Sequence, residues 1–216
     1  MDLDVRMLTV GPLQENCFLV RADADATSAV MVDPGEEASR LIAAIEEAGV
    51  ALEAILLTHC HFDHIGAVAP VARATGAEVW CPQLETDLLT DLMTYMPYPD
   101  LGPYESYDPE HTVAGGETLQ LAGLEIDVLP TPGHSPGHVT YAPRGANAIF
   151  SGDVLFQSSI GRTDLPGGDY LTLLRSIAEL LDRFDDDTRV HPGHMGLTTL
   201  GTERRTNPFL AELLRG

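Results

Sequence analysis

Lysine is absent from this 216-residue sequence, in which arginine supplies all 12 basic residues against 33 acidic ones. The formal net charge is therefore −21. A field this negative repels phosphate groups, so we expect neither nucleic acid nor an anionic membrane surface as a partner. The acidic, lysine-free composition also indicates adaptation to a salty cytoplasm, where screening by salt removes the cost of self-repulsion.

Cysteine is scarce, and no apolar run approaches the ~20 residues that cross a bilayer. The three cysteines, Cys17, Cys60 and Cys81, lack the spacing of a disulfide framework. The chain begins Met1-Asp2-Leu3-Asp4, without the basic start and apolar stretch of a secretory signal. We therefore predict a cytoplasmic protein whose cysteines are reduced.

Short apolar strand patterns alternate with amphipathic helix patterns along the chain. The strands are predicted at residues 5–10, 16–21, 29–32, 54–57, 78–80, 118–121, 124–129, 138–142, 148–151 and 189–190. The helices are predicted at residues 36–48, 67–75, 85–93, 170–184 and 208–214. Residues 82–110 are irregular, and a packed surface loop is favoured there over a lid. This order predicts a layered α/β sandwich with helices outside two sheets.

Four metal-ligating side chains fall within six residues, directly after the predicted strand 54–57: His59, His61, Asp63 and His64. His59 and His61 are two residues apart, so an extended segment projects both rings to one side, and imidazole is a good zinc ligand. Asp63 and His64 lie where the chain turns into a helix, within reach of a second metal. A histidine-rich surface loop is disfavoured, because an apolar strand leads straight into the cluster.

Three more candidate ligands each follow a predicted strand. His134 and His194 both stand in a Pro-Gly-His turn, and Asp153 stands in a Ser-Gly-Asp turn. Glycine lets the chain pass close to a metal, although each turn alone also fits an ordinary loop. The full set of seven oxygen and nitrogen ligands favours a catalytic site, because structural zinc sites are closed tetrahedra rich in cysteine.

Taken in order over nearly the whole chain, these segments resemble the motifs of the metallo-β-lactamase superfamily. The matching segments are residues 58–64, 131–137, 151–153 and 192–194. Residues 159–169 and 203–210 further resemble the short glyoxalase II-like hydrolases, which are related to hydroxyacylglutathione hydrolase. The resemblance implies an αββα sandwich of two mixed β-sheets, formed by a single domain over residues 1–216. It also implies that the C-terminal helical region with which full-length glyoxalase II holds glutathione is missing.

The resemblance further implies two divalent metal ions, most commonly Zn²⁺, with iron or manganese as alternatives. His59, His61 and His134 would bind the first ion. Asp63, His64 and His194 would bind the second, and Asp153 would bridge the two. Such a net positive centre lowers the pKa of water and stabilises an oxyanion. The implied reaction is hydrolysis of 2-hydroxyacyl thioesters by a metal-bound hydroxide that Asp63 orients.

The implied partner is a small-molecule thioester, and the protein is expected to be a monomer or a small homo-oligomer. Arg162 matches a basic residue that follows the bridging motif in the family, so it is a candidate substrate contact. An ion pair with Asp164 or Asp169 that fixes the loop explains the same arginine equally well. The sequence leaves both interpretations of Arg162 open.

Other histidines and cysteines near the motifs have simpler interpretations. His138 and His191 do not match ligand positions, and we expect hydrogen-bonding or ordinary structural roles for them. His111 lies in an acidic segment, where an exposed loop residue is expected. Cys60 stands between two ligands in the extended segment, so its side chain should face away from the metal.

Three alternative functions remain open. Persulfide dioxygenases of the same fold share a segment like Gly161-Arg162-Thr163-Asp164 and use one Fe(II), held here by His59, His134 and Asp153. Lactone, β-lactam or other ester hydrolysis would use the same hydroxide. A non-catalytic metal-binding module is the least favoured, because seven oxygen and nitrogen ligands do not match the closed, cysteine-rich tetrahedra of structural zinc sites.

Overall fold

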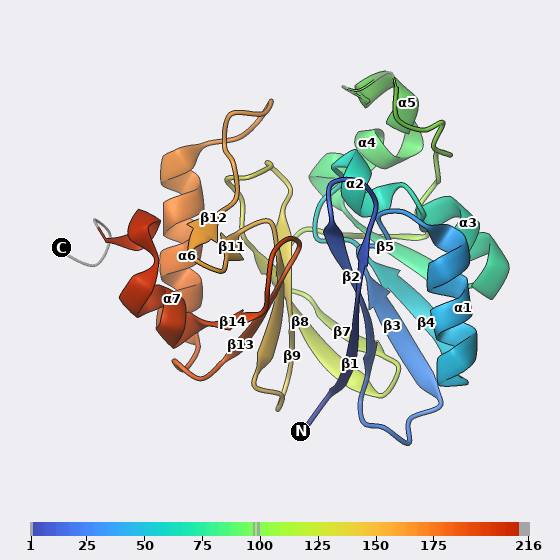
Figure 1. Cartoon of the computed structure of the whole chain (residues 1–216), viewed down its shortest axis with the longest axis horizontal. Coiled ribbons are helices and arrows are strands. Elements are labelled where there is room, and N and C mark those ends of the chain that lie inside the picture. The colour runs from blue at the N-terminus through green and yellow to red at the C-terminus, as the bar shows by residue number, and fades with distance from the viewer. Residues whose placement is uncertain (1, 97, 99, 212–216) are drawn as a thin grey trace.

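Two six-stranded sheets pack face to face, and helices cover their outer faces (Figure 1). The computed structural model describes residues 2–96, 98 and 100–211. The layers follow the order helix, sheet, sheet, helix, as the sequence predicted. None of the helices within the described residues is both long and apolar enough to span a bilayer.

The first sheet contains the first six strands in chain order, with antiparallel pairing at its start and parallel pairing after it. These strands are β1 (Asp4–Val10), β2 (Glu15–Arg21), β3 (Ser28–Val32), β4 (Ala51–Leu56), β5 (Glu78–Pro82) and β6 (His111–Val113). Parallel neighbours need crossover connections. Here these are α1 (Ala38–Ala48), then α2 (Phe62–Ile65) with α3 (Val68–Thr75), and then η1 (Gln83–Glu85) with α4 (Thr86–Thr90) and α5 (Leu92–Tyr95).

The second sheet has the order β14-β13-β10-β9-β8-β7. Its strands are β7 (Thr118–Leu121), β8 (Leu124–Pro130), β9 (Val139–Pro143), β10 (Ala148–Gly152), β13 (Arg189–Pro192) and β14 (Thr198–Thr199). Helix α6 (Tyr170–Arg183) is the crossover between the parallel strands β10 and β13. A small hairpin of β11 (Leu155–Phe156) and β12 (Ser159–Ile160) precedes α6, and α7 (Leu200–Thr206) with η2 (Pro208–Leu210) follows β14.

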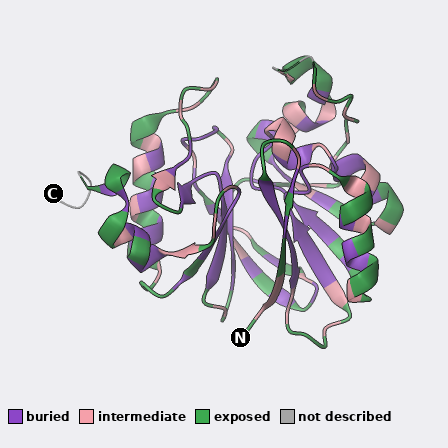
Figure 2. Ribbon diagram, viewed as in Figure 1, coloured by how far each residue is buried: buried purple, intermediate pink, exposed green. Residues whose placement is uncertain are grey.

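Strand β2 shows how the sequence builds the layers. Phe18 and Val20 point into the core between the sheets, where they join Tyr141 of the second sheet. Cys17 and Leu19 point the opposite way, into the core beneath the helices of the first sheet. Successive side chains of a strand alternate between faces, so a strand that is buried on both faces lies between two packed layers. Figure 2 shows these central strands as the most continuously buried part of the molecule.

The structure differs from the sequence prediction in several short elements. Strands β6, β11, β12 and β14 and helix α7 were not predicted, because segments of two to seven residues carry too little periodic pattern. The helix predicted at 85–93 is broken at Asp91, which has φ −136° and ψ 50°. The helix predicted at 208–214 is a 3₁₀ turn over Pro208–Leu210, and residues 212–214 lie outside the described residues.

Candidate metal centre

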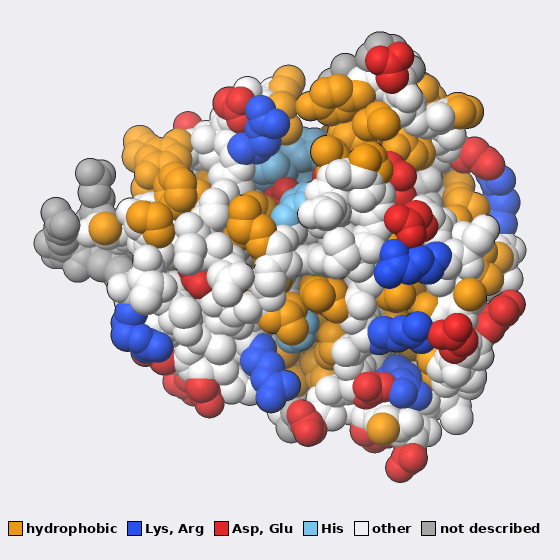
Figure 3. Space-filling view, in the orientation of Figure 1, with side chains coloured by type: hydrophobic (Ala, Val, Ile, Leu, Met, Phe, Trp, Pro, Cys, Tyr) orange, Lys and Arg blue, Asp and Glu red, His pale blue; other side chains and the backbone are white. Residues whose placement is uncertain are grey.

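All seven side chains proposed as ligands meet at one edge of the two sheets. They come from segments that follow the strands: His59 and His61 after β4, Asp63 and His64 in α2, His134 between β8 and β9, Asp153 after β10, and His194 after β13. Their ligand atoms form two groups, each within 4.8 Å: His59, His61 and His134, and then Asp63, His64 and His194. Figure 3 shows histidine side chains at the base of a hollow in this region of the surface.

The carboxylate of Asp153 lies between the two groups. Its Oδ2 is 3.5 Å from His134 Nε2 and 3.6 Å from His194 Nε2. Its Oδ1 is 3.5 Å from His64 Nε2. This carboxylate therefore reaches both groups at once, as a bridging ligand would have to.

The outward nitrogen of each of three histidines is fixed by a hydrogen-bond partner. His59 Nδ1 is 3.0 Å from Thr58 Oγ1, and His64 Nδ1 is 3.0 Å from Asp33 Oδ2. His134 Nδ1 is 2.8 Å from the carbonyl oxygen of Arg162. Such partners fix the ring orientation and leave the Nε2 atoms directed at the cluster.

The inward atoms of the cluster are the observation that tests whether metal ions fit. His59 Nε2, His64 Nε2 and Asp153 Oδ1 are buried and have no hydrogen-bond partner among the described residues. His61 Nδ1 and His134 Nε2 face each other at 2.8 Å. Buried polar atoms are almost always satisfied, so lone pairs that converge on one space fit divalent cations.

A third group of potential ligands, Asp33, His59 and His64, shares two members with the others. Asp33 contacts His64 through Nδ1, the nitrogen opposite the one that faces Asp153. Its carboxylate also accepts hydrogen bonds from the Thr58 amide at 2.7 Å and from the Thr58 hydroxyl at 2.6 Å. Asp33 is therefore a support behind the ligands and not a third metal site.

Charge in the cluster is unevenly distributed. Burial lowers the pKa of His64, but the carboxylates of Asp153, Asp63 and Asp33 outweigh burial, so the pKa is raised well above its ordinary value. Burial raises the pKa of Asp63, but His64 and His194 outweigh it and hold the pKa far below the usual range. Burial and the neighbouring His134 lower the pKa of His61 to about 4. The second group thus holds Asp63 as an ionised carboxylate, which favours positive charge beside it.

Two glycines let the ligand loops approach the cluster. A Cβ atom on Gly193 would overlap Asp153 Oδ1 and His64 Cε1. Gly133 has a φ of +132°, and a Cβ atom there would overlap the backbone of Leu173 in α6. Glycine is therefore required by close approach in both Pro-Gly-His turns, and by a positive φ as well at Gly133.

Two residues that hold the ligand loops in place were missed by the sequence analysis. The Glu85 carboxylate accepts hydrogen bonds from the Ser135 hydroxyl and from the amides of Cys60 and Gly137. It therefore joins the loop of His59 and His61 to the loop of His134. Asn16 donates through Nδ2 to the carbonyl oxygens of Pro192 and Met195, on either side of His194.

Arg162 forms the ion pair that the sequence left open. Its Nε and Nη2 each lie 2.7 Å from a carboxylate oxygen of Asp164, and Asp169 instead caps α6 at the Thr172 amide. Arg162 also lines the cavity above the cluster. Its role toward a substrate stays a prediction.

The structural roles of the other singled-out residues are clear. His138 accepts a hydrogen bond from the Asp153 amide at 3.1 Å. The side chain of Cys60 turns away from the ligands, as predicted, into the core beneath the helices of the first sheet, where its Sγ lies 3.4 Å from Cys81 Sγ. His191 is buried and stacks on Phe150. His111 lies in β6 and not in a loop, where its ring stacks on Trp80 and contacts Glu78 at 2.7 Å, and its side chain is exposed as predicted.

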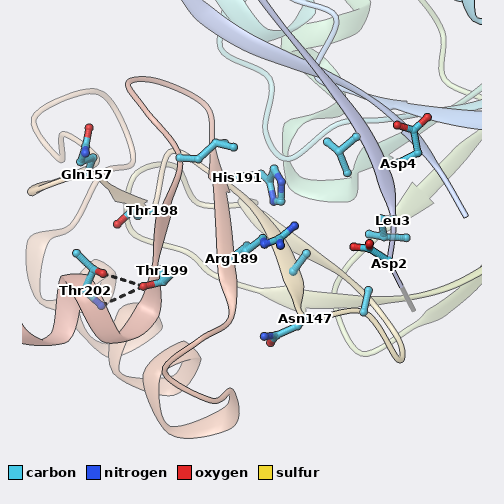
Figure 4. Close-up of a pocket in the computed structure, with 14 residues that line it drawn as sticks. Asp2, Leu3, Asp4, Asn147, Gln157, Arg189, His191, Thr198, Thr199 and Thr202 are labelled. Carbon is cyan, nitrogen blue, oxygen red and sulfur yellow. Dashed lines mark hydrogen bonds between the residues drawn. The ribbon is translucent and has the colours of Figure 1, made fainter. Parts of the chain in front are cut away.

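Two cavities are separate from each other. One of about 720 Å³ lies over the cluster and is lined by His61, Asp63, His134, Asp153 and His194 together with apolar residues. The other, of about 770 Å³, shares no lining residue with it and contains His191 and Arg189 beside the first residues of the chain (Figure 4). The candidate chemistry belongs to the cavity over the cluster.

A pair of mixed sheets between helices, with seven histidines and aspartates gathered at one edge, defines a metal-binding αββα protein. A family model for the metallo-β-lactamase superfamily matches residues 10–194, and the chain belongs to this superfamily of metallo-hydrolases.

Relatives and solved structures agree with this assignment. The chain is 39% identical to the hydroxyacylglutathione hydrolase GloC of Haemophilus influenzae, over 96% of this chain and 98% of that protein. The solved structure of BLEG-1 B3 metallo-β-lactamase has a TM-score of 0.90 and 38% identity, covering 96% of this chain and 100% of that one. The solved structure of TTHA1623 in a di-iron-bound form has a TM-score of 0.78 and 43% identity, covering 95% of this chain and 100% of that one. The metal carried by the latter shows that zinc is not established for this group of proteins.

Proposed function

We propose that the chain is a binuclear metal-dependent thioesterase that hydrolyses thioesters of 2-hydroxy acids. The observation that carries the proposal is the pair of ligand groups with the Asp153 carboxylate between them. The identity to a hydroxyacylglutathione hydrolase supports the substrate class. A small-molecule substrate, a cytoplasmic location and a monomeric or small homo-oligomeric state belong to the same proposal.

The residues assigned to each metal follow from the two groups. One ion would be held by His59, His61 and His134. The other ion would be held by Asp63, His64 and His194, and Asp153 would contact both ions. When bound, two such cations lower the pKa of water and polarise a carbonyl oxygen. Zinc suits imidazole and carboxylate ligands, and iron or manganese are the alternatives.

Asp63 has a second task in this proposal. Its Oδ2 is 3.3 Å from His194 Nε2, and its carboxylate stays ionised because the neighbouring histidines outweigh burial. An ionised carboxylate at the cavity wall can accept a hydrogen bond from the attacking water and orient it. Since a thiolate leaves readily, the reaction needs little protonation of the leaving group.

The experiment that tests the proposal is hydrolysis of S-lactoylglutathione by metal-replete protein, alongside metal analysis of the same sample. We expect turnover that is lost after chelation and restored when metal is added back. A sample that holds two metal ions per chain but hydrolyses no 2-hydroxyacyl thioester would contradict the proposal.

Hydrolysis of a β-lactam is the second candidate, because BLEG-1 is described as a B3 metallo-β-lactamase and shares 38% identity with this chain. A chromogenic cephalosporin measured beside the thioester distinguishes the two. Dioxygenase chemistry on a persulfide would need only His59, His134 and Asp153, and it would consume oxygen. Oxygen uptake without thioester hydrolysis would favour that alternative.

A further inference from the structure

The wall of the cavity over the metal cluster is largely apolar. Large apolar side chains reach it from the β1–β2 turn, from α4 and α5, and from the segment after His194: Leu13, Leu88, Leu92, Tyr95 and Met195. Three of these side chains are far from buried, with exposed fractions of 45% for Leu13, 52% for Tyr95 and 55% for Met195. Figure 3 shows hydrophobic side chains gathered beside the hollow that contains the histidines. Exposed apolar side chains that converge on one concavity are typical of a binding surface.

Positive charge is nearly absent from the same wall. Arg162 is the one basic side chain among the described residues that line this cavity, histidines apart. Its guanidinium is paired with Asp164 through two of its N–H groups, and Tyr98 lies beside it. The pair of Arg162 and Asp164 is neutral as a unit, within a chain whose net charge is −21. Among the described lining residues, the wall therefore offers no unpaired arginine to an anionic part of a substrate.

A glutathione thioester would bring carboxylates into this cavity. A carboxylate that loses water without gaining a cation or several donors is costly, whereas apolar surface gains about 25 cal/mol for each Å² removed from water. A 2-hydroxyacyl group is small, so most of a cavity of about 720 Å³ is left for the thiol portion of the substrate. The charge and the apolar character of the wall thus favour a thiol portion that is uncharged and apolar.

We propose that this cavity binds an uncharged, apolar thiol portion, so that 2-hydroxyacyl thioesters of apolar thiols are better substrates than those of glutathione. The inference rests on the proposed thioesterase function and deepens it. Leu13 and Tyr95 are the specificity-determining residues that it names, because they line the cavity without contributing to the metal cluster.

The test compares two thioesters of lactic acid, one with benzyl mercaptan and one with glutathione. Both thiols are primary alkyl thiols, so the leaving-group chemistry is similar and the difference lies in recognition. We expect kcat/KM to be roughly tenfold higher for the benzyl thioester. Leu13→Ser and Tyr95→Ser should each lower that value by roughly threefold to tenfold and change the glutathione thioester by less than about twofold.

Two further variants sharpen the comparison. Leu171→Ser removes an exposed apolar side chain, 61% accessible, from α6 outside the cavity, and hydrolysis of both substrates should be unaffected. Asp164→Asn frees the Arg162 guanidinium, and the glutathione thioester should gain about threefold relative to the benzyl thioester. A wild-type preference for the glutathione thioester, together with no effect of Leu13→Ser and Tyr95→Ser, would overturn the inference.

A binding measurement separates failure of this inference from failure of the proposed function. N-phenyl-1-naphthylamine is an uncharged dye that fluoresces in apolar surroundings. We expect it to bind the wild type and Leu171→Ser equally, and to bind Leu13→Ser and Tyr95→Ser more weakly. If no thioester is hydrolysed but the dye follows this order, the thioesterase proposal fails and the apolar subsite stands. Equal dye binding by all four proteins would remove the subsite itself.

Discussion

The side chain of Asn16 reaches from the first sheet to the loop that carries His194. Its Nδ2 donates to Pro192 O at 3.1 Å and to Met195 O at 2.9 Å, while Thr9 donates to its Oδ1 at 2.9 Å. Asn16→Ala should weaken binding of the second metal by roughly tenfold or more, because groups behind a ligand fix its position. Competition with a coloured chelator measures this.

Thr9→Val is the matched control for Asn16→Ala. It removes only the bond that orients the amide, so its effect on the affinity of the second metal should be smaller. Unchanged affinity for both metals in Asn16→Ala would show that the loop of His194 is held without this residue.

His191 predicts how stability depends on pH. Burial lowers its pKa to about 4, below the ~6.5 of an unfolded chain, so the unfolded state binds the extra proton between these values. The contribution of His191 is therefore fully present above about pH 6.5 and is lost as pH falls toward 4, by about 3 kcal/mol. In His191→Phe, which keeps an aromatic ring against Phe150, the free energy of unfolding should decline correspondingly less on acidification.

Urea unfolding of metal-free protein at pH 8, 6 and 4.5 measures this difference. Chelation keeps metal release out of the comparison. Parallel pH profiles for the wild type and His191→Phe would show that the ring is not held neutral by burial.

At the scale of residues, spacing predicted His59, His61, Asp63 and His64, because four ligating side chains directly follow an apolar strand. The other three candidates each follow a strand in a glycine turn, and the family resemblance assigned them to the metals. Asp33, Glu85 and Asn16 could not be predicted in the same way. Each makes its contact with a segment at least 25 positions away, and nothing in the local pattern marks such a partner. That the seven bind metal is still a proposal.

At the scale of elements, the short turn η1 has an importance that its length does not suggest. Glu85, at its end, accepts hydrogen bonds from donors of two ligand loops: Ser135 Oγ, Cys60 N at 2.6 Å and Gly137 N at 2.9 Å. Burial raises the pKa of Glu85, and these donors, Ser135 foremost, lower it in part. The turn thus fixes the distance between His61 and His134.

Glu85→Gln should destabilise the protein by about 1–3 kcal/mol, because an amide NH₂ would replace an acceptor that faces buried donors. It should also lower the affinity for the first metal, because the ligands of that metal lie on the two loops. Urea unfolding and metal titration check both effects. Gln83→Glu lies on the same turn but outside these contacts. It should change the free energy of unfolding and the affinity for the first metal much less than Glu85→Gln does. A fully stable Glu85→Gln variant would contradict this account of η1.

Long periodic elements could be predicted from sequence, and short ones could not. Helix α6 was predicted to within one residue, because Leu173, Ile177 and Leu180 repeat along one face. Strand β6 has no alternating apolar pattern and is held by pairing with β5 and by the stack of His111 on Trp80. Tertiary contacts of this kind leave no periodic trace in the sequence.

At the scale of the whole molecule, the excess of acid is the dominant electrostatic feature. The chain has 33 acidic and 12 basic residues, so 21 carboxylates would have no arginine partner even if every arginine were paired. Salt near 1 M shortens the screening length to about 3 Å, so this self-repulsion should largely disappear. We expect the Tm to rise by about 5 °C or more in molar KCl. Equal concentrations of NaCl should act alike, and a Tm independent of salt would contradict adaptation to salt.

The pairing of the two halves could be anticipated only through the family resemblance. Alternation within β2 predicts that a layer covers each face, but it does not say that Tyr141 of the second sheet lies opposite Phe18. That residues 1–216 form a single domain stays a prediction.

The central claim is that seven side chains coordinate two metal cations. Anomalous diffraction from a crystal of the metal-loaded protein tests it most directly. We predict two peaks about 3.5–4 Å apart, one against His59, His61 and His134 and the other against Asp63, His64 and His194, with Asp153 between them. A single peak at full metal loading, or peaks that lie away from these side chains, would contradict the account.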